Sequence, residues 1–208
     1  MKKPIIIFDI DYTLYSTQQF RDFFAEILLS EFNISKDQWQ EAYNKHSATL
    51  KNRSDFRPNT FLKFLETELN IPHKKLKKYY YQDLIHKRAI FEDVSEVLEH
   101  LSKTHTLGIF SEGFKIYQKH KLIKGKIHHH FHPEYLFIHR RKLRPSAIKK
   151  LPDHSIVIDD KLEIVDAINS FPNKVEAIWL NRKSSEKHPT AKTIHTLKEL
   201  FNLIEKLT

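Results

Sequence analysis

The chain has 208 residues, of which 35 are Lys or Arg and 26 are Asp or Glu, so its formal charge is +9 at pH 7. With 40% hydrophobic and 29% charged residues, it has the composition of a globular protein rather than a disordered one. It contains no cysteine, which excludes disulfides and cysteine-ligated metal centres and fits a reducing cytoplasm. No apolar segment approaches the ~20 residues of a membrane-spanning helix. We therefore expect a soluble, cytoplasmic protein without a membrane partner.

The first element is an apolar run at residues 4–8, which two aspartates follow, Asp9 and Asp11. A short, continuously apolar run is typical of a strand that is buried on both faces of a parallel sheet. Side chains alternate along a strand, so we expect the two carboxylates to point the same way, about 7 Å apart. Like charges this close are costly unless a cation or a shared proton compensates them. The pair therefore indicates a metal-assisted site where the strand ends.

Residues 16–90 are predicted to be almost purely helical. Capping-box patterns predict helix starts at Ser16 and Ser35, and Pro58 and Pro72 stand where two further helices begin. This block is inserted directly after the first strand. We predict that it forms a helical cap, and that residues 1–15 and 91–208 form the core.

From residue 91 onward, predicted strands and helices alternate. The strands are expected at 106–110, 135–138, 155–158 and 175–180, and the helices near 94–101, 114–122, from 146, around 164–168 and at 193–207. Such alternation is typical of βαβ units with a parallel sheet. The predicted fold class is therefore α/β: a Rossmann-like core with a parallel sheet, plus the inserted all-helical cap.

Further polar residues stand where the other predicted strands end. Ser111 follows the second strand, Asp159 and Asp160 follow the fourth, and Lys142 lies a few residues beyond the third. Because the carboxyl ends of parallel strands face one crevice, we expect these side chains to meet the two N-terminal aspartates there. Phosphoryl transfer needs such groups: a nucleophile, a proton donor, a divalent cation and donors for the phosphate oxygens.

In this order, the residues resemble the motifs of the haloacid dehalogenase (HAD) superfamily of phosphotransferases. The first motif, Asp-x-Asp-x-Thr, stands here as Asp9-Ile10-Asp11-Tyr12-Thr13, the second ends at Ser111, the third is Lys142, and the fourth is Asp159-Asp160. The segment from Ser111 through Gln118 to Lys121 also looks like the helix that follows the second motif in that family. The resemblance covers the whole length of the chain.

The resemblance implies catalytic roles. Asp9 would attack phosphorus to form an aspartyl-phosphate, and Asp11 would serve as general acid and then general base. Dehalogenases of the superfamily lack an aspartate at the position of Asp11. Lys142 would offset the negative charge of Asp9. Arg144 is the alternative, because it directly precedes Pro145 as the family's lysine commonly precedes a proline; we favour Lys142 because an ammonium is a compact point charge.

The resemblance also implies a Mg²⁺ cofactor. Its protein ligands would be the carboxylate of Asp9, the backbone carbonyl of Asp11 and the carboxylate of Asp160, with Asp159 close by. We favour Asp160 over Asp159 as the direct ligand, and both stay open at this point.

Substrate phosphate would be bound by the hydroxyl of Ser111 and the backbone N–H groups of Glu112 and Gly113, near the start of a helix. Tyr12 departs from the family pattern, in which glycine or a small polar residue is common at this position. Thr13 would hydrogen-bond to the backbone of the loop rather than contact substrate.

We predict a Mg²⁺-dependent phosphatase that hydrolyses small phosphorylated metabolites through an aspartyl-phosphate. The alternatives are a sugar phosphomutase, a phosphatase acting on nucleic-acid phosphate ends, as the +9 charge suggests, and a non-catalytic anion-binding protein. An enclosing cap argues against nucleic acid as partner. The histidines at 128–132 and the tyrosines at 79–81 are interpreted as loop and packing residues. Neither the substrate's identity nor the oligomeric state follows from these residues.

Overall fold

The computed structural model describes residues 4–205, and within them six parallel strands form one sheet. The strand order is β3-β2-β1-β4-β5-β6. The strands are β1 (Ile5–Phe8), β2 (Thr106–Glu112), β3 (Phe131–His139), β4 (Ile156–Asp159), β5 (Glu176–Leu180) and β6 (Thr193–Ile194). This is the doubly wound order of a Rossmann-like sheet, so the predicted α/β fold class is confirmed.

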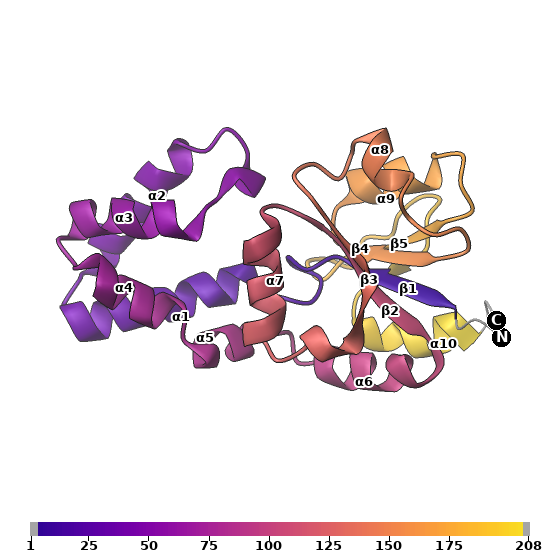
Figure 1. Cartoon of the computed structure of the whole chain (residues 1–208), viewed down its shortest axis with the longest axis horizontal. Helices are drawn as coiled ribbons and strands as arrows, with labels where there is room; N and C mark the ends of the chain where they lie inside the picture. The colour runs from indigo at the N-terminus through magenta and orange to yellow at the C-terminus, as the bar shows by residue number, and fades with distance from the viewer. Residues whose placement is uncertain (1–3, 206–208) are drawn as a thin grey trace.

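Both faces of the sheet are buried, as the apolar run of β1 predicts. Ile6 and Phe8 belong to one hydrophobic cluster, whereas Ile7 between them belongs to another. Helices α6 (Val94–Thr104) and α10 (Leu200–Glu205) cover the first face. Helices α8 (Pro145–Ile148) and α9 (Leu162–Asn169) cover the second (Figure 1). Because helices occupy both sides, β1 has no solvent-facing position for a polar residue.

Between residues 16 and 90, every regular helix or sheet element is helical, as predicted. These helices lie together on one side of the molecule (Figure 1). They are α1 (Thr17–Phe32), α2 (Lys36–Ala48), the 3₁₀ turn η1 (Arg53–Asp55), α3 (Pro58–Leu69), α4 (His73–Tyr80) and α5 (Asp83–Arg88). Ser16 caps α1, Ser35 forms the expected capping box before α2, and Pro58 is the first residue of α3, while Pro72 lies one residue before α4.

The chain enters and leaves this helical segment through two adjacent stretches. The N–H of Ser16 donates to the carbonyl of Ala89 at 2.7 Å, and the N–H of Phe91 donates to the carbonyl of Leu14 at 3.2 Å. Helix α7 (Lys115–Lys124) lies between the helical segment and the sheet (Figure 1). Two adjacent, hydrogen-bonded stretches therefore join the helical segment to the rest of the chain, and α7 lies between that segment and the sheet.

Two elements differ from the sequence prediction. Strand β3 begins at Phe131, four residues earlier than expected. Residues 193–194, expected to start the last helix, form the edge strand β6 instead, and Leu180 pairs with Ile194 there. Only after the 3₁₀ turn η3 (Leu197–Glu199) does α10 begin. A two-residue strand is too short to show alternation, so no local pattern distinguishes it from a helix start. The expected end of that helix, Leu207, lies outside the described residues.

None of the helices within residues 4–205 combines the length and the apolar character needed to cross a membrane.

Candidate active site

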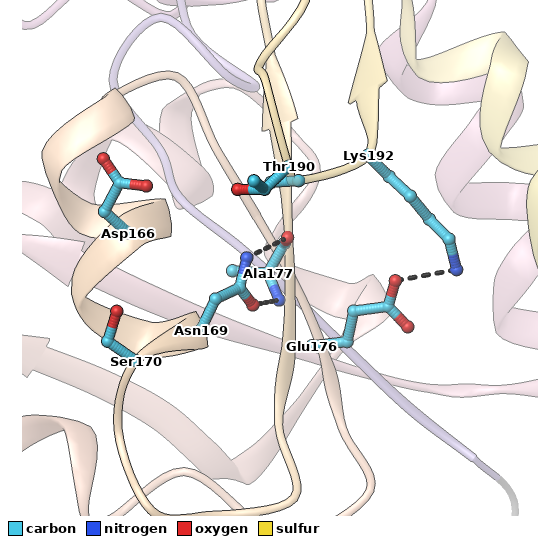
Figure 2. A pocket seen from close by; sticks show the side chains of 8 residues that line it. Asp166, Asn169, Ser170, Glu176, Ala177, Thr190 and Lys192 are labelled. Carbon is cyan, nitrogen blue, oxygen red and sulfur yellow. Dashed lines mark hydrogen bonds and ion pairs between the residues drawn. The ribbon is translucent and has the colours of Figure 1, made fainter.

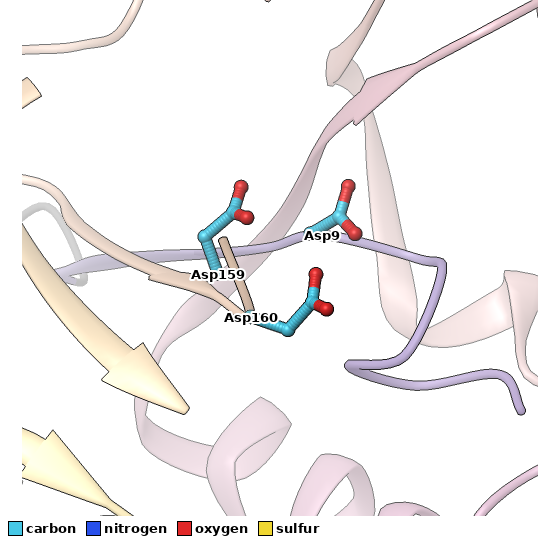
Figure 3. A group of neighbouring side chains, drawn as sticks. All are labelled: Asp9, Asp159 and Asp160. Carbon is cyan, nitrogen blue, oxygen red and sulfur yellow. The ribbon is translucent and has the colours of Figure 1, made fainter. Parts of the chain in front are cut away.

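Three aspartates meet at the carboxyl ends of β1 and β4. Asp9 directly follows β1, Asp159 is the last residue of β4, and Asp160 comes next. These strands are neighbours at the point where the strand order reverses, which is where open α/β sheets bind ligands. Each aspartate places a carboxylate oxygen within 4.8 Å of the others, and Figure 3 shows the three side chains reaching toward the same space. We call these three residues the acidic cluster.

Lys142 contacts the acidic cluster from within the protein. Its Nζ donates to Asp9 Oδ1 at 2.7 Å and to the carbonyl of Phe110 at 3.1 Å, and it also pairs with Asp159. The side chain is only 1% exposed. Burial lowers the pKa of Lys142, but the two aspartates outweigh burial and hold this pKa above its ordinary value. Arg144, the alternative drawn from the sequence, is exposed and immediately precedes α8. Of the two residues, Lys142 is therefore the one that reaches the cluster.

The acidic cluster carries more negative charge than Lys142 offsets. Burial, with the neighbouring Asp9 and Asp159, raises the pKa of Asp160 to about 8, and burial raises the pKa of Asp9 to about 6. Within residues 4–205, the buried Oδ1 of Asp160 has no hydrogen-bond partner. Asp159 differs, because it pairs with Lys142 and accepts the N–H of Lys161 at 3.0 Å.

These features fit a bound magnesium ion. Carboxylate oxygens are the ligands that Mg²⁺ prefers, and a cation among them would use the free oxygen of Asp160 and reverse the rise in pKa. The sequence-based preference for Asp160 over Asp159 agrees with this geometry.

Asp11 lies apart from the acidic cluster, in a separate set of contacts. Its Oδ1 accepts from Lys121 Nζ and from Thr17 Oγ1, both at 2.5 Å, and its Oδ2 accepts from Gln118 Nε2 at 2.7 Å. Burial raises the pKa of Asp11, but Lys121 and the hydrogen bonds outweigh burial and lower it overall. The carboxylate is therefore held in its ionised form. The sequence indicated Gln118 and Lys121 only as part of a helix that resembles one in the family, not as partners of Asp11. Nothing in the sequence pointed to Thr17 as a third partner.

The predicted phosphate-binding segment differs from expectation at one residue. Ser111 is fully buried at the end of β2, and its Oγ accepts from Gln118 Nε2 at 3.1 Å. Gly113 has a φ of +135°, a backbone conformation that favours glycine. Its N–H, however, donates to the carbonyl of His139 at 2.8 Å, because β2 continues beside β3 to Glu112, two residues beyond its predicted end. This donor is therefore already used in the structure, and phosphate binding by the Gly113 N–H stays a prediction.

The loop after Asp9 explains one departure from the family pattern and corrects one expectation. Tyr12 has a φ of +61°, in the left-handed region where a residue without Cβ fits best, which gives a reason for the glycine common in the family. The buried Oγ1 of Thr13 has no hydrogen-bond partner within residues 4–205, so the expected hydroxyl contact with the loop backbone is absent. The Thr13 carbonyl instead accepts from Arg182 at 3.0 Å.

The helical segment also contacts the core beside Lys142. Asp55, in turn η1, pairs with both Arg140 and Arg141; the Arg141 guanidinium lies 3.1 and 3.2 Å from the two carboxylate oxygens. Both arginines also donate to Ser54 at 2.6 Å. We call this set of contacts the Arg–Asp latch. Its partners are some 85 residues apart in the chain, so no local pattern could reveal it.

Two cavities of about 450 Å³ differ in their relation to the acidic cluster. The first lies at α9 and β5, where Asn169 bonds the backbone of Ala177 and Glu176 pairs with Lys192 (Figure 2). No predicted site residue lines it. The second is lined by Ser47, Leu50, Lys51, Asn52 and Arg53 of the helical segment and by Lys161. None of the three aspartates lines this second cavity, but Lys161 directly follows Asp160 in the chain and donates its N–H to Asp159.

The sequence matches the model of the haloacid dehalogenase-like hydrolase family over residues 6–150. The chain therefore belongs to this family of hydrolases. No curated protein matches it.

Solved structures share the fold over nearly the whole chain. A candidate HAD hydrolase, YfnB from Bacillus subtilis, described as bound to magnesium, has 15% identity and a TM-score of 0.65, covering 98% of this chain and 99% of its own. A β-phosphoglucomutase candidate from Thermotoga maritima has 15% identity and a TM-score of 0.64, covering 99% and 100%. L-2-haloacid dehalogenase from Xanthobacter autotrophicus, with chloropropionic acid covalently bound, has 13% identity and a TM-score of 0.63, covering 100% of both chains. These names describe different reactions, so the fold alone does not select one.

Proposed function

We propose that this hydrolase is a Mg²⁺-dependent phosphatase of small phosphorylated metabolites in the cytoplasm, with residues 16–90 as its cap. The observation that carries the proposal is the acidic cluster: three converging carboxylates, one with an unpartnered buried oxygen, beside a buried lysine. The presence of Asp11 supports phosphoryl chemistry over dehalogenation, because dehalogenases of the superfamily lack an aspartate there. The similarity to a magnesium-bound hydrolase supports the choice of metal.

In the first step, a carboxylate oxygen of Asp9 attacks phosphorus in line, and the bond between phosphorus and the leaving oxygen breaks. Asp11 protonates that leaving oxygen. Lys142 offsets charge on Asp9, while the Ser111 hydroxyl and the Glu112 N–H donate to phosphate oxygens. Bound magnesium, held by the acidic cluster and the Asp11 carbonyl, would supply further positive charge beside the phosphoryl group.

In the second step, Asp11 takes a proton from water, which attacks phosphorus and releases free phosphate and the carboxylate of Asp9. The ionised state of Asp11 suits this step, because Lys121 and Gln118 hold the carboxylate that must accept the proton. For the first step, substrate must weaken the contact with Lys121 so that Asp11 can carry a proton.

A sugar phosphomutase is the second candidate, supported by the similarity to the β-phosphoglucomutase candidate. The same Asp9 chemistry would return the phosphoryl group to a sugar rather than to water. A strict requirement for a sugar bisphosphate activator, with no net phosphate release, would select this candidate. An end-processing phosphatase for nucleic acid has less support, because Asp55 of the helical segment is paired with Arg140 and Arg141 of the core, which directly precede Lys142 in the chain.

The test is phosphate release from a panel of phosphorylated metabolites, with Mg²⁺ and with chelator. Asp9→Asn should abolish release, whereas Asp153→Asn, which removes an exposed aspartate elsewhere, should retain it. Release that survives in Asp9→Asn above a few per cent would exclude Asp9 as nucleophile. Release unaffected by chelator would exclude the metal, and folded protein that is silent across the panel would refute the phosphatase proposal.

A further inference from the structure

The cavity that Lys161 lines is positively charged. We call it the cationic pocket, and define it by Ser47, Leu50, Lys51, Asn52, Arg53 and Lys161. Three of its lining residues are cations, and none is acidic. Its volume of about 450 Å³ is in the range of cavities that bind small ligands.

The positive charge of the cationic pocket is left largely unneutralised. Within residues 4–205, neither Lys51 nor Arg53 forms an ion pair. The nearest acid in the sequence, Asp55, already pairs with Arg140 and Arg141 in the Arg–Asp latch. Lys51 and Arg53 are therefore cations without an acidic partner in the described part of the chain, whereas the third cation, Lys161, pairs with Glu112.

The segment that carries Arg53 is held in place. The side-chain oxygen of Asn52 accepts from the Ser54 N–H at 2.9 Å and from the Ser54 hydroxyl at 2.7 Å, which caps turn η1 at its start. The Arg–Asp latch fixes the end of the same turn against the core. Arg53 thus extends from a turn that is anchored on both sides, although its own side chain is exposed.

Lys161 connects the cationic pocket with the acidic cluster. Its N–H donates to Asp159 at 3.0 Å, and its ammonium lies 3.2 Å from Glu112. The side chain of Lys161 therefore lines the pocket, while its backbone N–H binds one carboxylate of the acidic cluster.

We propose that the cationic pocket binds a second anionic group of the substrate. The substrate class is then a small phosphomonoester that also carries a carboxylate or a second phosphate, with Arg53, Lys51 and Lys161 as specificity-determining residues. The inference rests on the proposed function, which places the first phosphate at Asp9. A ligand with only hydroxyl groups would leave Lys51 and Arg53 without a counter-charge, whereas a second anion pairs with them and forms charge-assisted hydrogen bonds.

The experiment compares ligands in matched pairs that differ in the second anion. The pairs are 3-phosphoglycerate with glycerol 3-phosphate, and fructose 1,6-bisphosphate with fructose 6-phosphate. Calorimetric titrations with Mg²⁺ use Asp9→Asn, so that the ligands are not consumed, and wild-type turnover is measured in parallel. We expect about tenfold or tighter binding of the doubly anionic member of at least one pair. A preference in the first pair identifies a carboxylate, and a preference in the second identifies a phosphate.

Adding Arg53→Gln to Asp9→Asn should remove most of that preference, because one of the three cations is lost. Adding Lys63→Gln, which removes an exposed cation of α3 outside the pocket, should leave the preference intact. Equal binding within about twofold for both pairs, or a preference that Arg53→Gln leaves unchanged, overturns the inference.

Turnover and binding measurements together test the cationic pocket and the proposed phosphatase activity independently of each other. Wild-type phosphate release without any preference for a second anion overturns the inference alone. A preference that depends on Arg53, in a protein that releases no phosphate, supports the pocket and overturns the proposed phosphatase. Tight binding of an oligonucleotide with a 5′-phosphate, in place of the small ligands, would assign the pocket to nucleic acid and also overturn the inference.

Discussion

Replacing Lys142 by methionine tests the electrostatic reasoning at the site most directly. The side chain is 1% exposed, and its ammonium contacts Asp9 at 2.7 Å as well as Asp159, which is fully buried. Methionine preserves an unbranched chain of similar length but removes the only cation that contacts the acidic cluster within residues 4–205. The substitution therefore leaves buried carboxylates without a compensating charge.

The expected loss of unfolding free energy is about 3–5 kcal/mol at neutral pH without metal, the usual cost of removing one partner from a buried ion pair. For a chain of this size, that loss lowers the melting temperature by roughly 6–20 °C. The loss should depend on pH in a defined direction. The pKa of Asp9 is about 6 even with Lys142 present, above its ordinary value of 3.8, and removing the ammonium raises it further. The folded variant therefore binds more protons than the unfolded chain, so its deficit is largest at alkaline pH and shrinks as pH falls.

The assay is urea denaturation of the wild type and of Lys142→Met at pH 8 and pH 6, with and without Mg²⁺. Lys149→Met, which removes an exposed lysine of the same charge, is the control and should change stability by less than about 0.5 kcal/mol. Magnesium should restore part of the loss, because it binds only the folded protein. A loss below about 1 kcal/mol for Lys142→Met, or a deficit that grows as pH falls, would refute the reasoning.

Three further predictions concern other residues. His86 is fully buried, and burial, with the charge of a neighbouring histidine, lowers its pKa to about 3. Because the unfolded chain takes up that proton below about pH 6.5, the stability advantage of the wild type over His86→Gln should shrink by about 2 kcal/mol between pH 6.5 and 4.5 in urea denaturation. Lys121→Met should raise the pKa of Asp11 and move the acidic limb of the kcat profile to higher pH, and an unmoved limb would contradict the assigned contact. Asp55→Asn should lower the free energy of unfolding by about 1 kcal/mol or less, because the Arg–Asp latch is partly exposed. It should raise KM severalfold for a doubly anionic substrate, and an unchanged KM would show that the latch does not position the cationic pocket.

The sequence alone determined the fold class and most of the converging residues. Apolar runs bounded by polar residues mark buried parallel strands, and all such strands in one sheet end at the same edge. The sequence pattern therefore assigns Asp9, Lys142 and Asp160 to one site. Helix-start patterns such as the Ser35 capping box involve only residues close together in the chain. The helical character of residues 16–90 was therefore also predictable.

Only the tertiary structure decided which donors are free and which are already used. The Gly113 N–H is used by the carbonyl of His139 because β2 continues beside β3 beyond its predicted end, and the Asp11 carboxylate is held by Lys121 of α7. The Arg–Asp latch and the cationic pocket join the helical segment to Arg140, Arg141 and Lys161 of the core. Local periodicity records which face of an element is buried, whereas hydrogen bonds and ion pairs between distant elements depend on how those elements pack, so only the folded chain reveals them.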